Sequence, residues 1–186
     1  PVYLVISICL LSAGIFLYFF FEDGNFLYEG KNVHLTFVIL EISLLTSFVV
    51  GKWRSVYARP FALCALLVLM TSDRRKAIFM NCITCILLFM SDAFVSVDLT
   101  VDKDLYASLV IGFITGIMAI YLLDGTGSRF KVLIYGLPIA LPVIAACMLL
   151  NVDLIPARWI EFLVDGVASG LLSVIFMTVW LPLFEE

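Results

Sequence analysis

Residues 105–123 read LYASLVIGFITGIMAIYLL, a run of 19 residues without a charged side chain. A helix crosses the ~30 Å hydrocarbon core of a bilayer with roughly 20 such residues, because it pairs its backbone groups internally. Strands of a membrane barrel would instead alternate in polarity over about 10 residues. The run therefore predicts a membrane-spanning helix, which ends where Asp124 and Gly125 begin a turn.

The rest of the chain has the same character. Of its 186 residues, 63% are hydrophobic and 14% are charged, and the mean hydropathy is +1.15. An ordinary soluble domain is about 45–50% apolar and about 25% charged, and a soluble fold of this length cannot bury so much apolar surface. The net charge of −4 argues against nucleic acid as a partner, since nucleic acid requires a basic footprint. Composition thus excludes a soluble enzyme, a disordered tail and a nucleic-acid-binding module, and it predicts a multi-pass protein in a lipid bilayer.

Charged and turn residues divide the chain into seven apolar runs, which predict an all-α membrane bundle of about seven helices forming one domain over residues 1–186. The third and fourth runs are short, so they are either two thin or tilted spans or a re-entrant hairpin. The chain begins and stops directly at apolar runs, which we interpret as a segment of a longer protein. The seven runs are residues 2–21, 35–51, 60–72, 77–91, 105–123, 132–152 and 159–184.

The basic residues do not orient this bundle by the positive-inside rule. With the C-terminus in the cytoplasm, the inner loops carry six of the 11 basic residues and the outer loops carry five. The charged turn at residues 73–76 is the best marker of the cytoplasmic side. The loop with Lys52, Arg54 and Arg59 does not fit an outer position, and it favours the re-entrant alternative.

Two acidic residues lie inside predicted spans, where an ionised carboxylate is costly and is a candidate functional site. Glu41 is near the middle of the second span, and Asp165 is six residues into the last one, with no evident partner nearby in sequence. For Asp165, the functional interpretation is a polar vestibule shared with Glu161, one turn earlier on the same face. The alternative is that both acids lie at interface depth, with Arg158 close enough to pair with Glu161. For Glu41, the functional interpretation is a proton-coupled or cation-binding site. The alternative for Glu41 is a hydrogen bond to a polar residue of a neighbouring helix, for which Ser43, Thr46, Asn81 and Thr84 are candidates.

Catalytic chemistry has little support in this sequence. His34 is the only histidine, and a metal site built on one histidine and scattered carboxylates would be weak. Cys82 and Cys85 have the spacing of a redox or metal motif, but inside a span this spacing is more often two small core residues. We therefore expect no catalytic residue, no metal site and no cofactor in this segment.

Small residues and prolines predict how the helices pack. Gly112 and Gly116 in the fifth span, and Gly166 and Gly170 in the seventh, form GxxxG pairs that let helix backbones approach closely. Packing inside the bundle is the first interpretation, and a homodimer interface is the second. In the sixth span, Pro138 and Pro142 remove two backbone donors, so we expect a kink, a break or a hinge there.

The last span resembles a known family. The pattern Gly166-x-x-x-Gly170-Leu-Leu-Ser, followed by apolar residues and Leu181-Pro182-Leu183-Phe184-Glu185, is similar to the end of the membrane domain of the seven-transmembrane-receptor HD-hydrolase family. The upstream order is also similar, with a short helix led by Pro60 and a tight charged turn at residues 73–76. By hydropathy the resemblance covers the whole chain, and the motif-specific part is the last twenty or so residues.

This resemblance implies a seven-helix sensory and relay domain in a bacterial cytoplasmic membrane. An extracellular domain would precede it, and a cytoplasmic HD phosphodiesterase acting on cyclic di-AMP would follow it. Residues Leu181, Pro182 and Glu185 would form the output joint at the cytoplasmic face, while the segment itself would not be an enzyme. The alternative function is a small-molecule transporter or substrate-capture subunit, with its site at Glu41, Asp165 and the proline-containing sixth span.

Overall fold

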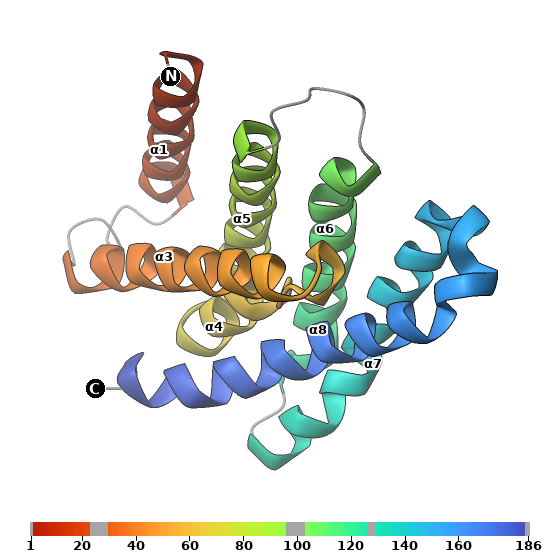
Figure 1. Ribbon diagram of the computed structural model, residues 1–186. Coiled ribbons are helices and arrows are strands. Elements are labelled where there is room, and N and C mark those ends of the chain that lie inside the picture. Colours follow the sequence, from red (N-terminus) through yellow and green to blue (C-terminus); the bar gives the residue numbers. More distant parts are fainter. Residues whose placement is uncertain (1, 23–29, 96–102, 126–128, 185–186) are drawn as a thin grey trace. The chain divides into compact units, whose positions relative to one another are not determined.

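The computed structural model describes residues 2–22, 30–95, 103–125 and 129–184, and these contain helices and no strand. The predicted all-α membrane bundle is confirmed, and Figure 1 shows the individual helices. The elements are α1 (Val2–Glu22), α3 (Gly30–Trp53), η1 (Val56–Ala58), α4 (Leu63–Thr71), α5 (Arg74–Val95), α6 (Lys103–Leu123), α7 (Arg129–Leu150), η2 (Val152–Leu154) and α8 (Ile155–Phe184).

The helix lengths suit a bilayer. All the α-helices except α4 have 21 to 30 residues, which corresponds to about 32–45 Å. Over the described residues, three of them meet both the length and the hydropathy of a spanning helix, namely Lys31–Trp53, Arg74–Phe94 and Ala157–Phe184. The chain is therefore a multi-pass membrane protein.

The chain forms two compact units, residues 1–38 and residues 39–186. The first contains α1 and the beginning of α3, and α1 exposes large apolar side chains such as Phe16 and Phe20, which stack on each other. In the second unit, α5 packs on α6, α6 on α7 and α7 on α8, while α4 contacts α5, α6 and α8. The apolar side chains on the outer faces of these helices are suited to contact with lipid.

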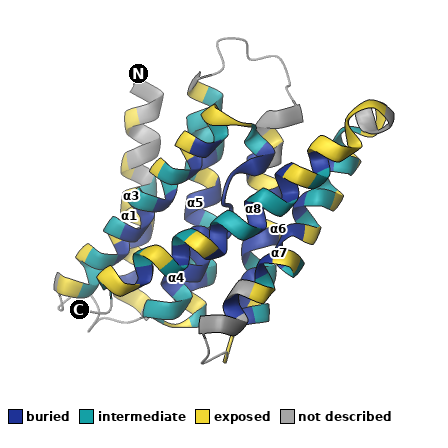
Figure 2. Cartoon of the chain, turned by 60° about the horizontal axis from the view of Figure 1, so that its bottom comes forward, coloured by how far each residue is buried: buried dark blue, intermediate teal, exposed yellow. Residues whose placement is uncertain are grey.

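The third and fourth runs differ from both sequence interpretations. Helix α4 has nine residues, about 14 Å, so it cannot span a bilayer, and residues 57–68 are all buried. It lies inside the bundle, dark blue in Figure 2. Helix α5 has 22 residues, because Arg74 and the two basic residues after it form its first turn rather than a loop. The pair is thus a short central helix followed by a full-length one.

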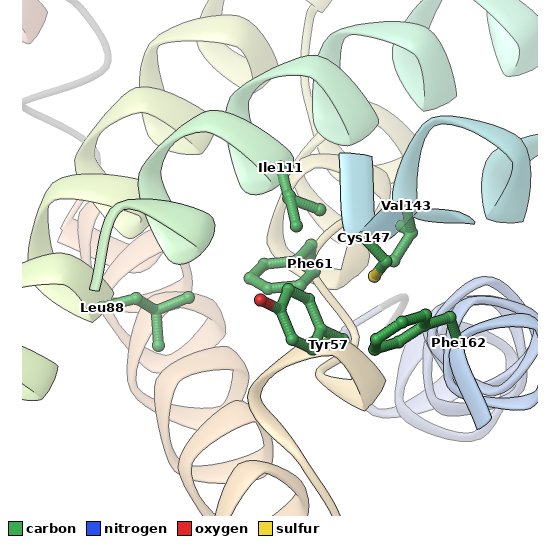
Figure 3. Close-up of a cluster of buried hydrophobic side chains, with 7 residues drawn as sticks. All are labelled: Tyr57, Phe61, Leu88, Ile111, Val143, Cys147 and Phe162. Carbon is green, nitrogen blue, oxygen red and sulfur yellow. The ribbon is translucent and has the colours of Figure 1, made fainter. Parts of the chain in front are cut away.

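The core of the second unit gathers side chains from six parts of the chain. Figure 3 shows Phe61 and Tyr57 in the middle, with Leu88 of α5 on one side and Phe162 of α8 on the other. The Tyr57 and Phe162 rings meet edge to face, with centroids 6.3 Å apart. Residues just before α4 therefore hold the surrounding helices together.

The prolines of α7 do not break the helix. Residues 129–150 form one α-helix with Pro138 and Pro142 inside it. In α8, the non-helical backbone is at Arg158, so the regular helix starts at Trp159, as the sequence predicts. Helix α8 then continues through Pro182 to Phe184.

Candidate functional site

The segment between α3 and α4 carries the main polar cluster of the second unit, and we call residues 54–59 the arginine loop. Its Ser55 hydroxyl accepts a hydrogen bond from the Ala58 backbone N–H at 3.2 Å, which caps the short helix η1. The Tyr57 hydroxyl accepts a hydrogen bond from the Asn151 amide at 2.8 Å, just after α7. These bonds fix the loop so that its two arginines point to different helices.

Arg59 is an ion-paired arginine that is 5% exposed. Its Nη1 and Nη2 donate to the two carboxylate oxygens of Asp92 on α5, at 2.6 and 2.7 Å. Ser108 of α6 donates to Asp92 at 2.6 Å and accepts from Arg59 Nη1 at 3.1 Å. The Arg59 carbonyl accepts a hydrogen bond from Ser169 of α8. One residue thus connects three helices.

The surroundings of Arg59 explain how a buried charge is tolerated. The bidentate pair with Asp92 is a strong form of charge-assisted hydrogen bond. It offsets part of the desolvation cost of both groups, while Arg59 Nε is buried without a hydrogen-bond partner among the described residues. The guanidinium also packs on Gly51, where an added Cβ would overlap Arg59 Nε. Gly51 is in the last turn of α3, whose partial negative charge stabilises a cation.

Arg54 is paired with Asp165 of α8. The Arg54 Nε donates to Asp165 Oδ1 at 2.5 Å, and the Ser55 hydroxyl donates to Oδ2 at 2.6 Å. The Asp165 side chain is 10% exposed and the Arg54 side chain 45%. The partner that Asp165 lacks nearby in sequence therefore comes from a loop 111 residues earlier, and the pair is open to solvent through Arg54.

The predicted polar site of Glu41 and Asp165 is not assembled in the described residues. Glu41 is exposed on α3, and no hydrogen bond or ion pair involves it within the described chain. Its candidate partners Thr46 and Thr84 instead donate to carbonyls of their own helices, at 2.6 and 2.8 Å. Within the same residues, no three His, Cys, Asp or Glu side chains are placed to hold a metal ion.

The four glycines of the GxxxG pairs make close contacts within the chain. A Cβ added at Gly112 would meet Cys85 and Phe61, and one at Gly116 would overlap the Asn81 side chain. The two glycines of α8 lie against α7 instead: a Cβ at Gly166 would overlap Ile144, and one at Gly170 would overlap the Gly136 carbonyl. Both faces are therefore used inside the bundle, and the homodimer stays a prediction that these contacts do not test.

The remaining predicted residues lie in α7 and at the end of α8. Pro138 and Pro142 are half-buried within the continuous α7, so their role as a hinge stays a prediction. Leu181 is buried and Pro182 is exposed in the last turn of α8. Glu185 lies outside the described residues.

Sequence reasoning did not find the pairing of Arg59 with Asp92 and Ser108. Asp92 follows the fourth predicted run, which ends at residue 91, whereas in the structure it lies in the last turn of α5. The available signal was the loop with Lys52, Arg54 and Arg59, which did not fit an outer position. Two of these three basic residues are paired with acids of other helices.

Comparison with known proteins agrees with the helical architecture. A family model described as "7TM receptor with intracellular HD hydrolase" matches residues 1–186. No curated protein and no solved structure matches the sequence. Since the family model covers the whole sequence, the chain belongs to the family of seven-transmembrane receptors with an intracellular HD hydrolase.

Proposed function

We propose that this domain senses a signal at the end of the bundle that holds the arginine loop and relays it to an attached HD phosphohydrolase. On this proposal the hydrolase acts on cyclic di-AMP, the bundle lies in a bacterial cytoplasmic membrane, and its C-terminus is in the cytoplasm. An extracellular domain of the same chain would deliver the signal.

One observation carries the proposal: α8 contains both Asp165, which pairs with the arginine loop, and the last turn with Leu181 and Pro182. About 17 residues separate Asp165 from Pro182, or ~25 Å of continuous helix. Because Asp165 and the output joint belong to the same helix, a shift or rotation of α8 at Asp165 would also move the output joint. No contacts through other helices are needed for this coupling.

The buried pair of Arg59 and Asp92 supplies a reason for two discrete states. A buried arginine–carboxylate pair that loses one partner costs about 3–5 kcal/mol, so intermediate geometries are unfavourable. The loop therefore either holds α5, α6 and α8 together or releases one of them. Such a bistable element is what a relay requires, since both ends of the molecule can bias it.

The pairing also supports the proposed orientation. The outer position of the arginine loop conflicts with the positive-inside rule only if its charges are free. Arg54 and Arg59 form ion pairs with Asp165 and Asp92, so the unpaired positive charge on that side is smaller than the count of residues. A cytoplasmic C-terminus is then compatible with the basic turn at residues 73–76.

The test compares two arginines, each of which forms an ion pair with an acid of α8. In the full-length protein, Arg54→Gln should change cyclic di-AMP hydrolysis by about fivefold or more, the lower end of typical coupling energies. Arg158→Gln is the matched control, because Arg158 forms an exposed pair with Glu161, and exposed pairs contribute little. Equal hydrolysis rates for Arg54→Gln, Arg158→Gln and the parent protein would rule out the arginine loop as the input.

No observation in the described residues favours the transporter alternative. Its two acids have different surroundings, since Glu41 is exposed and Asp165 is already paired. Helix α7, which would supply a broken helix at the site, is continuous through both prolines.

A further inference from the structure

A pocket of about 400 Å³ lies where the turn between α4 and α5 meets the end of α6. Its apolar part is formed by Leu69, Met70 and Leu123, and its charged part by Asp73, Arg74 and Asp124. The volume is within the range of about 300–1,000 Å³ that small-molecule sites occupy. The arginine loop contributes nothing to this pocket, so the two sites are separate.

Arg74 is held in place before any ligand arrives. Its guanidinium lies over the Tyr121 ring, 3.9 Å from the centroid, and its Nη1 donates to Asp124 at 3.0 Å. A guanidinium has five N–H donors in a planar arrangement, and the Arg74 side chain remains 39% exposed. Arg74 therefore keeps donor capacity for an oxyanion in a fixed orientation.

The two carboxylates give the pocket a mixed charge. The Asp73 side chain is 82% exposed, and its contact with Lys76 is long, at 3.7 Å. The Asp124 side chain is 43% exposed. A purely anionic ligand would be repelled by both acids, and a purely cationic one by Arg74. A ligand with an anion and a cation a few atoms apart matches both sets of groups.

The pocket is next to the start of a predicted spanning segment, where lipid headgroups are expected. The spanning segment of α5 begins at Arg74, and Tyr121, which is 60% exposed, is an aromatic residue of the kind found at the membrane–water interface. The apolar side chains lie next to the charged ones, as the glycerol and first acyl carbons of a lipid lie next to its headgroup. A zwitterionic lipid headgroup therefore matches both the mixed charge and the apolar side chains of the pocket.

We propose that this pocket binds the headgroup of phosphatidylethanolamine. The lipid phosphate accepts hydrogen bonds from Arg74, and the primary ammonium donates to Asp73 and Asp124. Leu69 and Met70, which are half-buried, contact the glycerol and the start of the acyl chains. A choline headgroup fits less well, because its quaternary ammonium has no N–H to donate.

Native mass spectrometry of the full chain in detergent tests the proposal by counting retained lipids. Phosphatidylethanolamine should bind about tenfold more tightly than phosphatidylcholine, which corresponds to about 1.4 kcal/mol. It should also bind more tightly than phosphatidylglycerol, which lacks the ammonium. Equal retention of the ethanolamine and choline lipids, or tighter binding of phosphatidylglycerol, would overturn the zwitterion site.

Two pairs of variants locate the binding. Arg74→Gln should reduce retention of phosphatidylethanolamine about tenfold, while Arg75→Gln, an exposed neighbour that does not line the pocket, should leave it unchanged. Asp73→Asn should remove the preference for ethanolamine over choline, while Asp153→Asn at the distant helix η2 should preserve it. Equal losses in both members of a pair would indicate a nonspecific surface and contradict the proposal.

Discussion

At the scale of single residues, Arg59 shows how a membrane bundle accommodates a charge. Its two terminal nitrogens bind the Asp92 carboxylate and the Ser108 hydroxyl, while Nε has no hydrogen-bond partner among the described residues. The guanidinium fits against the bundle because Gly51 has no side chain. Each partner is on a different helix, so the geometry of the pair depends on all of them at once. Gly51 is accordingly a positioning residue for Arg59.

Substitution of Gly51 by alanine should destabilise the bundle through Arg59. The new Cβ would overlap the guanidinium and displace Arg59, which leaves Asp92 without its partner. Loss of one partner of a buried ion pair lowers the free energy of unfolding by about 3–5 kcal/mol. Alanine has a higher helix propensity than glycine, and this difference offsets about 1 kcal/mol of the loss in stability. We expect the midpoint of thermal unfolding in detergent to fall by about 5 °C or more, at 2–4 °C per kcal/mol.

The control for this change is Gly14→Ala. Gly14 is also inside a long helix, but an added Cβ would meet nothing within 4 Å. Its unfolding midpoint should stay the same or rise, because only the helix propensity changes. If both alanine variants unfold at the same temperature, Gly51 does not position Arg59.

At the scale of elements, α7 and α8 pack through glycines. Gly170 faces the Gly136 carbonyl and the Ala140 backbone nitrogen, so backbone meets backbone. Such close approach increases van der Waals contact between helices, which is a main source of stability in lipid. The same packing holds α8 against α7 between Asp165 and the last turn of α8.

Two alanine variants of this contact should differ in stability. In Gly170→Ala the new Cβ overlaps backbone atoms, which cannot move without separating the helices. In Gly136→Ala it lies 3.2 Å from the end of the flexible Leu171 side chain. We expect Gly170→Ala to lower the free energy of unfolding by about 1–3 kcal/mol and Gly136→Ala to lower it less. Unfolding in detergent measures both, and the reverse order would show that this contact does not hold α7 to α8.

At the scale of the whole molecule, α8 joins the arginine loop to the end of the described chain. Pro182 is inside its last turn and has no N–H to donate, which weakens that turn at the point where the helix ends. The proposed relay therefore ends at a turn that is softer than the helix before it. A change in the stiffness of this turn should alter how motion of α8 reaches the attached domain.

Substitutions in the output joint test this link. Pro182→Ala restores a backbone donor and stiffens the turn, and Glu185→Ala removes the predicted charge of the joint. Either should change cyclic di-AMP hydrolysis by the full-length protein by about fivefold without reducing membrane insertion. Leu183→Ala is the matched control in the same turn, because Leu183 is 64% exposed. Normal regulation in both joint variants would contradict the relay through α8.

The sequence was sufficient to predict the helical segments and their approximate ends. An apolar run of about 20 residues in a bilayer forms a helix, because its backbone groups must pair internally. The runs 105–123 and 159–184 accordingly correspond to α6 and to most of α8. The boundaries of α5 were wrong because charges were treated as loop residues. Long basic side chains on a first helical turn can extend to the interface, which lets the helix include them.

The partners of the charged residues could not be predicted in the same way. Asp165 had no neighbour of opposite charge in its own helix, and its partner Arg54 is 111 residues away. Glu41 and Asp165 had the same sequence signature, an acid inside an apolar run. One is exposed and the other is buried in an ion pair, since burial depends on which helix faces which.

Hydropathy is a local property, and for that reason the sequence by itself determined the membrane environment, the helical class and the family motif near Leu181 and Pro182. Which side chains meet is a property of the packed bundle. Only the tertiary structure decided that α4 is buried in the centre and that Arg54 and Arg59 neutralise Asp165 and Asp92. Those contacts form between helices far apart in the chain, because a buried charge is stable only where the fold brings it a partner.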